Sequence, residues 1–213
     1  LGTSDQQTVT LGTASLIALT AIDSVVGTAG SDTVTFLGAG SLAINAVESL
    51  LGTSDQQTVT LGTASLIAIT AIDSVVGTAG SDTVTFLGAG SLAINAVESL
   101  LGTASLETVT LLAATSVAIT AIDSVLGTAN SDTVTFLGAG SLAINAVESL
   151  LGTSDQQTVT LGTASLIALT AIDSVVGTAG SDTVTFLGAG SLAINAVESL
   201  LGTSDQQTVT LGT

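Results

Sequence analysis

The feature that most constrains the fold is a tandem repeat of 50 residues. Residues 1–50, 51–100 and 151–200 differ at a single position, where Leu19 is matched by Ile69, while 101–150 is a more divergent copy and 201–213 begins a fifth. A fixed period of 20 to 50 residues is typical of solenoids, in which each unit buries its apolar face only against its neighbours. We therefore expect residues 1–213 to form one continuous solenoid, and we expect the chain to be a fragment of a longer repetitive protein.

A shorter period of 25 residues lies inside the repeat, because Thr8-Val9-Thr10 aligns with Thr33-Val34-Thr35 without a gap. Each 25-residue unit holds three stretches with alternating polarity and many β-branched residues, which favours strands over helices. These strands are expected near Thr8–Leu11, Ile17–Ala21 and Ile22–Val25. The pattern predicts an all-β fold, a parallel β-solenoid with about 25 residues per coil.

The composition excludes several classes of function. The chain has no Lys, Arg or His and a net charge of −17, so it cannot neutralise the phosphates of a nucleic acid or of an anionic membrane. Its apolar tracts are shorter than the ~20 residues of a spanning helix, so we expect no membrane insertion. Without His, Cys or Lys, the usual general bases and nucleophiles are missing. A carboxylate dyad such as Asp23 with Glu48 is the remaining catalytic option, but eight copies in a row argue against an enzyme.

The acidic residues fall into two sets when the chain is folded at 25 residues. The first, which we call the ladder set, comprises Asp23, Glu48, Asp73, Glu98, Asp123, Glu148, Asp173 and Glu198. In a 25-residue coil these carboxylates would stack one per rung, ~5 Å apart, at a cost of about 0.8 kcal/mol per neighbour in water. The ladder is interpreted either as a solvated edge or as a row of ligands for Ca²⁺, which takes 6–8 oxygen ligands.

The second set lies in the corner loops. This loop set comprises Asp5, Asp55, Asp155 and Asp205 in one loop type and Asp32, Asp82, Asp132 and Asp182 in the other, with Glu107 standing in for the third repeat. Carboxylates in loops of adjacent rungs could share a cation with backbone carbonyl groups.

The segment Gly27-Thr28-Ala29-Gly30-Ser31-Asp32-Thr33-Val34-Thr35 resembles the calcium-binding nonapeptide of RTX proteins, Gly-Gly-x-Gly-x-Asp-x-apolar-x. The residues before it resemble segments that flank such repeats in large secreted bacterial adhesins. The resemblance covers about nine residues in each fifty, and it implies a parallel β-roll that holds Ca²⁺ between successive turns. Thr28 stands where the family has its second glycine, and the intervening loop has Gln7 where an aspartate is expected, so any site would be mixed.

The divergent third repeat indicates which positions tolerate change. Ile17 and Leu19 stay apolar there, whereas Leu16 becomes Ser116, so the first two side chains should point inward and the third outward. The turn positions Gly27, Gly30, Gly77, Gly80 and Gly180 are matched at one place by Asn130, the residue that best tolerates a left-handed backbone after glycine. A left-handed backbone is therefore expected at Gly30 and its equivalents.

Threonine pairs flank an inward valine in every unit, so both hydroxyls should face solvent. The pairs in the first four units are Thr8 with Thr10, Thr33 with Thr35, Thr58 with Thr60, and Thr83 with Thr85. Such ranks resemble the flat faces of ice-binding solenoids, although threonine is also the common polar residue of exposed strands.

Together these patterns predict a structural repeat protein. We expect an extracellular or cell-surface fibre, stalk or adhesin that associates with itself end to end or laterally, with Ca²⁺ as its one candidate cofactor. The alternatives are an ice-binding protein and a functional amyloid in which separate chains supply the rungs.

Overall fold

The computed structural model describes residues 7–12, 16–28, 30–37, 39–53, 57–62, 66–78, 80–103, 107–113, 116–129, 131–153, 156–162, 166–203 and 206–212. The chain divides into two compact units, Leu1–Glu107 and Thr108–Thr213, which are treated separately below. Throughout these ranges the regular structure is strand, and no helix long and apolar enough to cross a membrane is found among them. The expected all-β class is confirmed.

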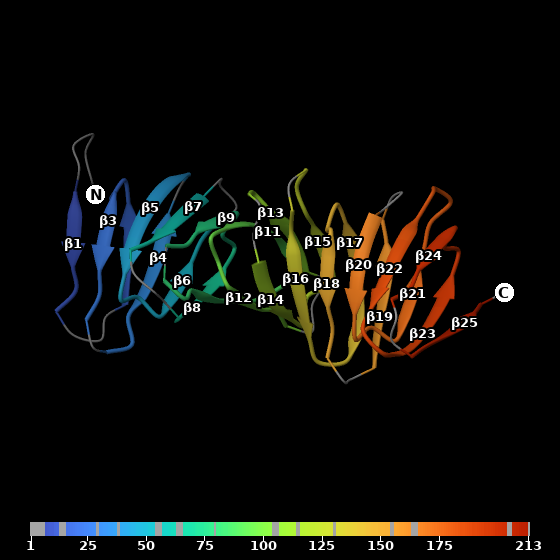
Figure 1. Ribbon diagram of the computed structural model, residues 1–213. Coiled ribbons are helices and arrows are strands. Elements are labelled where there is room, and N and C mark those ends of the chain that lie inside the picture. Colours follow the sequence, from blue (N-terminus) through green and yellow to red (C-terminus); the bar gives the residue numbers. More distant parts are fainter. Residues whose placement is uncertain are drawn as a thin grey trace. The chain divides into compact units, whose positions relative to one another are not determined.

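The first unit contains two parallel sheets, and successive strands of the chain alternate between them (Figure 1). Its odd sheet consists of β1 (Thr8–Thr10), β3 (Ser24–Val26), β5 (Gly40–Asn45), β7 (Gln57–Leu61), β9 (Ser74–Val76) and β11 (Gly90–Asn95). Its even sheet consists of β2 (Leu16–Thr20), β4 (Thr33–Leu37), β6 (Ser49–Leu51), β8 (Leu66–Thr70), β10 (Thr83–Phe86) and β12 (Ser99–Leu101).

The second unit has the same arrangement. Its odd strands are β13 (Glu107–Leu111, whose first residue closes the first unit), β15 (Ser124–Leu126), β17 (Gly140–Asn145), β19 (Gln157–Leu161), β21 (Ser174–Val176), β23 (Gly190–Asn195) and β25 (Gln207–Leu211). Its even strands are β14 (Ser116–Thr120), β16 (Thr133–Leu137), β18 (Ser149–Leu151), β20 (Leu166–Thr170), β22 (Thr183–Leu187) and β24 (Ser199–Leu201).

One coil of the solenoid is two strands long, one from each sheet. Thr8 pairs with Ser24, Ser24 with Ala43, and Ala43 with Thr60, at offsets of 16, 19 and 17 residues. The parallel β-solenoid is therefore confirmed, but the expected coil of 25 residues is wrong, because a coil averages about 17 residues. Each 25-residue unit does hold three strands, as expected, and three strands make one and a half coils.

This mismatch between sequence period and coil has a geometric consequence. Because 25 residues span one and a half coils, equivalent positions in successive 25-residue units lie in opposite sheets. Thr33-Val34-Thr35 is thus in the even strand β4, whereas its equivalent Thr58-Val59-Thr60 is in the odd strand β7. The full 50-residue repeat holds six strands, or three coils, and returns to the same sheet.

Alternation along each strand explains the core between the two sheets. In β4, Val34 and Phe36 are buried while Thr33 and Thr35 are half-buried, which matches the two-residue period of side chains in a strand. Leu19 is buried and Leu16 is exposed, as the third repeat indicated. Within each unit successive rungs come from the same chain, so the coils are covalently continuous there, unlike the layers of an amyloid fibril. The expectation of one continuous solenoid over 1–213 stays a prediction.

Candidate functional site

The acidic side chains lie at the corners, where the chain passes from one sheet to the other. We call the corners from an odd to an even strand the forward edge, and those from an even to an odd strand the return edge. Asp23 stands before the odd strand β3 on the return edge, whereas Glu48 stands before the even strand β6 on the forward edge.

The ladder set therefore does not stack one residue per rung, and that expectation is wrong. Asp23 and Asp73 share the return edge but are separated by three coils, or ~14 Å at a rung spacing of ~4.8 Å. Glu48 and Glu98 have the same separation on the forward edge. The repulsion expected between close neighbours in the ladder is thereby reduced, which matters in a chain that has no basic residue.

Each ladder residue instead holds the corner of the coil before it. The backbone N–H of Asp82 donates to Oε2 of Glu98 at 2.8 Å. In return, the N–H groups of Glu98 and Ser99 donate to the carbonyl oxygen of Asp82 at 3.2 and 3.1 Å. We call this reciprocal arrangement, between a residue and the acid 16 positions later, a corner clamp. The carboxylate bond recurs from Gln7 to Asp23, Asp32 to Glu48, Gln57 to Asp73, Asp132 to Glu148, Gln157 to Asp173 and Asp182 to Glu198.

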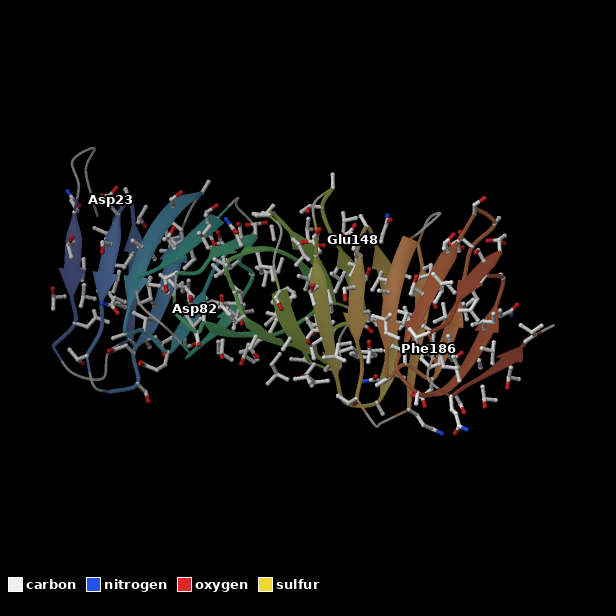
Figure 2. All side chains as sticks on the ribbon, viewed as in Figure 1. Asp23, Asp82, Glu148 and Phe186 are labelled. Atoms are coloured by element: carbon white, nitrogen blue, oxygen red, sulfur yellow. The ribbon has the colours of Figure 1, made fainter. Side chains whose placement is uncertain are left out.

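The first residue of each clamp turns its own side chain inward. Asp82, marked in Figure 2, is fully buried, and its Oδ2 accepts the N–H of Thr78 at 2.7 Å and the hydroxyl of Thr78 at 3.2 Å. Asp32, Asp132 and Asp182 are equally buried and accept from Thr28, Thr128 and Thr178. Because the chain offers no cation, N–H and O–H donors offset the cost of removing these carboxylates from water.

On the return edge the same buried position is glutamine, which can also donate. Oε1 of Gln57 accepts the N–H of Thr53 at 3.0 Å, as the aspartates do, while Nε2 donates to the carbonyl oxygen of Phe36 at 2.8 Å. Gln157 makes the same pair of bonds with Thr153 and Phe136. The difference that the sequence showed between the two loop types is therefore a difference in hydrogen-bonding capacity at one buried position.

Glycine at the start of the long loops leaves room for the next coil. The N–H of Gly77 donates to the carbonyl oxygen of Asn95 at 2.8 Å, and a Cβ built on Gly77 would overlap the carbonyl oxygen of Ala96. Gly27 has the same relation to Asn45 and Ala46. Close approach of two backbones is thus what requires glycine here.

The left-handed backbone that the structure records at the acid-bearing corners belongs to alanine. Ala21, Ala46, Ala71, Ala96, Ala121, Ala146, Ala171 and Ala196 have φ between 51° and 55°. Sequence reasoning missed them, since alanine carries no signal for a left-handed turn and such a conformation costs about 1–2 kcal/mol. The expected left-handed turn at Gly30, Gly80 and Gly180 stays a prediction, and Asn130 lies outside the described residues.

The described carboxylates do not fit a calcium site. No group of three or more acidic residues that could hold a metal ion occurs in the part of the chain that the structure describes. Asp32 accepts the N–H of Thr28, and Glu48 accepts the N–H of Asp32, so both carboxylates face N–H donors instead of an open cage. Asp5, Asp55, Asp155 and Asp205 lie outside the described residues, so their expected role as ligands stays a prediction.

The threonine pairs do not form one rank. Thr8 and Thr10 lie in β1 of the odd sheet, but Thr33 and Thr35 lie in β4 of the even sheet. Thr58-x-Thr60 returns to the odd sheet three coils after Thr8-x-Thr10, and Thr83-x-Thr85 follows Thr33-x-Thr35 in the even sheet. A hydroxyl pair on every third strand does not give the continuous grid on which the ice-binding alternative depends.

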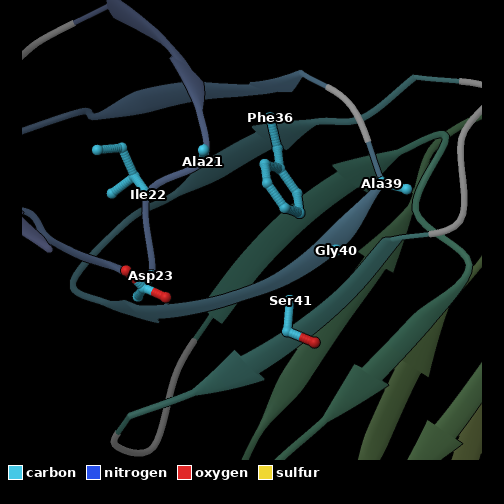
Figure 3. A pocket seen from close by; sticks show the side chains of 7 residues that line it. All are labelled: Ala21, Ile22, Asp23, Phe36, Ala39, Gly40 and Ser41. Atoms are coloured by element: carbon cyan, nitrogen blue, oxygen red, sulfur yellow. The ribbon is translucent and has the colours of Figure 1, made fainter. Parts of the chain in front are cut away.

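A pocket of about 220 Å³ opens beside the first return corner (Figure 3). Its lining is Ala21, Ile22, Asp23, Phe36, Ala39, Gly40 and Ser41. Asp23 is the single titratable group among these seven residues, and its Oδ2 already accepts the N–H of Gln7. The pocket therefore brings together no acid–base pair.

In comparisons with known proteins, no protein-family model, no curated protein and no solved structure matches the chain.

Proposed function

We propose that the chain is a structural spacer, part of an extracellular or cell-surface fibre, stalk or adhesin, which is lengthened by stacking coils. One observation carries the proposal: a coil buries its apolar row only when another coil follows it. Val59 and Leu61 in β7 are 0% and 1% exposed, whereas their equivalents Val209 and Leu211 in β25 are 37% and 74% exposed. A further repeat, or another copy of the chain, supplies the coil that covers this row.

The near identity of the repeats supports a mechanical role without catalysis. Every 50-residue repeat carries the same core and the same corner clamps, whereas an enzyme needs one unique cleft. The partner is then the chain itself, and neither a nucleic acid nor a membrane interior is involved, since the chain has no basic residue. The acidic edges keep so apolar a chain in solution. The extracellular setting rests on the resemblance to secreted adhesins.

The length of engineered arrays tests this function. Arrays of two, four, six and eight 50-residue repeats would be compared by small-angle scattering and electron microscopy. Stacked coils should lengthen the particle by ~14 Å per repeat, which is three rungs of ~4.8 Å. Particles that grow in all directions, like a globule that takes up added chain, would refute the spacer function.

Calcium is tested separately, by thermal unfolding with added Ca²⁺ and then with excess chelator. The clamps use backbone donors, so the described coils should melt at the same temperature in both conditions. A higher melting temperature with Ca²⁺ would place cations in the loops of Asp5, Asp55, Asp155 and Asp205, and mutation of these aspartates to asparagine would then abolish the difference.

A further inference from the structure

The two outer faces of the solenoid differ in chemistry. Leu37 and Leu51 on the even sheet are 39% and 44% exposed. The residues at the equivalent positions of the odd sheet, 25 residues later, are Gly62 and the half-buried Val76. The offset of one and a half coils is what sorts leucine to one face and small residues to the other.

The leucines recur along the even sheet of each unit. The exposed members are Leu16, Leu37, Leu51, Leu87 and Leu101 in the first unit and Leu137, Leu151, Leu187 and Leu201 in the second. The odd face shows mainly Thr, Ser, Ala and Asn, with exposed leucines in the third repeat at Leu112 and Leu126 and in the last strand at Leu211. We call the outer surface of the even sheet in either unit the leucine face.

The leucines lie among threonines without any charge between them. Leu37 is paired in register with Thr20, and Leu51 lies between Thr35 and Thr70. No even strand contains an acidic residue, because the described carboxylates stand at the corners or point into the core. The leucine face is therefore an uncharged apolar strip bordered by two acidic edges.

From this arrangement we propose that the leucine face is the surface by which two copies of the chain associate side by side. The inference rests on the proposed spacer function and adds to it the surface of lateral contact. A partner with a basic surface would dock at the acidic edges, whereas a second copy, at −17, can approach only where its charge is absent. Sheets pack face to face at ~10 Å, a distance at which the acidic edges of the two copies remain in solvent at the rim.

The area is sufficient for such a contact. Six even strands of the first unit, spaced ~4.8 Å apart and ~17 Å long, give a face of about 490 Å². Two such faces bury about 1,000 Å² in total, at the lower limit of specific interfaces, and every added repeat enlarges the contact. Lateral association should therefore strengthen with the number of repeats.

The test is sedimentation velocity and electron microscopy of the 213-residue chain and two variants. In the even-face variant, Leu37, Leu51, Leu87, Leu101, Leu137, Leu151, Leu187 and Leu201 are changed to Thr. In the matched odd-face variant, Val26, Val76, Leu126 and Val176 are changed to Thr. Circular dichroism of all three proteins checks that the strands persist.

The parent chain should form side-by-side pairs, more strongly at about 1 M than at about 0.1 M salt, because the Debye length falls from ~10 to ~3 Å and the acidic rims repel less. The even-face variant should lose at least tenfold in association constant, while the odd-face variant keeps it. A folded parent chain that stays single, or equal loss in both variants, overturns the inference. Growth of ~14 Å per repeat in the same arrays would still support the spacer function, so the two failures are distinguishable.

Discussion

The N–H of Gly77 donates to the carbonyl oxygen of Asn95, one coil later, and the carbonyl oxygen of Ala96 occupies the space where a side chain on Gly77 would lie. Changing Gly77 to Ala should therefore push two coils apart and lower the free energy of unfolding by about 3 kcal/mol. The control is Gly12→Ala, because a Cβ at Gly12 meets no atom within 4 Å. Urea unfolding should separate the two variants, and equal stability would show that the coils are not in this close register.

The corner clamp predicts a graded response at Glu98. Glu98→Ala removes the acceptor of the Asp82 N–H and should cost about 1–2 kcal/mol, while Glu98→Gln keeps an amide oxygen there and should cost less. Hydrogen exchange at the amide of Asp82 provides a local measurement. Its protection should fall in the alanine variant and persist in the glutamine variant; unchanged protection in both would mean that the bond does not form.

The left-handed alanines predict opposite effects of glycine at two nearby positions. Ala96 has φ of 51°, so Ala96→Gly should stabilise the chain by about 0.5–1 kcal/mol. Ala93 lies within the strand β11, where Ala93→Gly should destabilise by a similar amount. The melting temperatures should move in opposite directions. A loss of stability in both variants would contradict the left-handed corner.

Glu107 occupies a buried position that is glutamine in Gln57 and Gln157. Those glutamines donate to the carbonyl groups of Phe36 and Phe136, and a carboxylate has no N–H to donate. Glu107→Gln should raise the free energy of unfolding by about 1–2 kcal/mol, and Gln157→Glu should lower it by as much. Chemical unfolding of the pair checks both signs, and stabilisation by Gln157→Glu would refute the role of the amide.

Much of the fold follows from the sequence, because strand signals are local. The alternation in Thr33–Leu37 and the inward Leu19 need only the two-residue period of a strand, and the structure agrees. The length of the coil is not local. Three strands per 25 residues are compatible with a coil of three strands or of two, and the sequence period favoured the former. Only pairings such as Thr35 with Leu51 reveal the latter.

The error in the coil length also accounts for the errors at the candidate site. Folding at 25 residues placed Asp23 beside Glu48, whereas a coil of about 17 residues places Glu48 over the corner of Asp32. The clamp could have been found from a spacing of 16 between Asp32 and Glu48 that recurs at Gln57 and Asp73. The left-handed alanines had no such signal.

Pairing across the even sheet gives the most direct test of the coil length. The chain has no cysteine, so pyrene can be attached at introduced pairs alone. Thr85 and Leu101 are register partners in β10 and β12, whereas Thr60 and Thr85, 25 residues apart, lie in opposite sheets. Excimer fluorescence should be strong for Thr85→Cys with Leu101→Cys and absent for Thr60→Cys with Thr85→Cys. The reverse result would restore the 25-residue coil and contradict the solenoid described above.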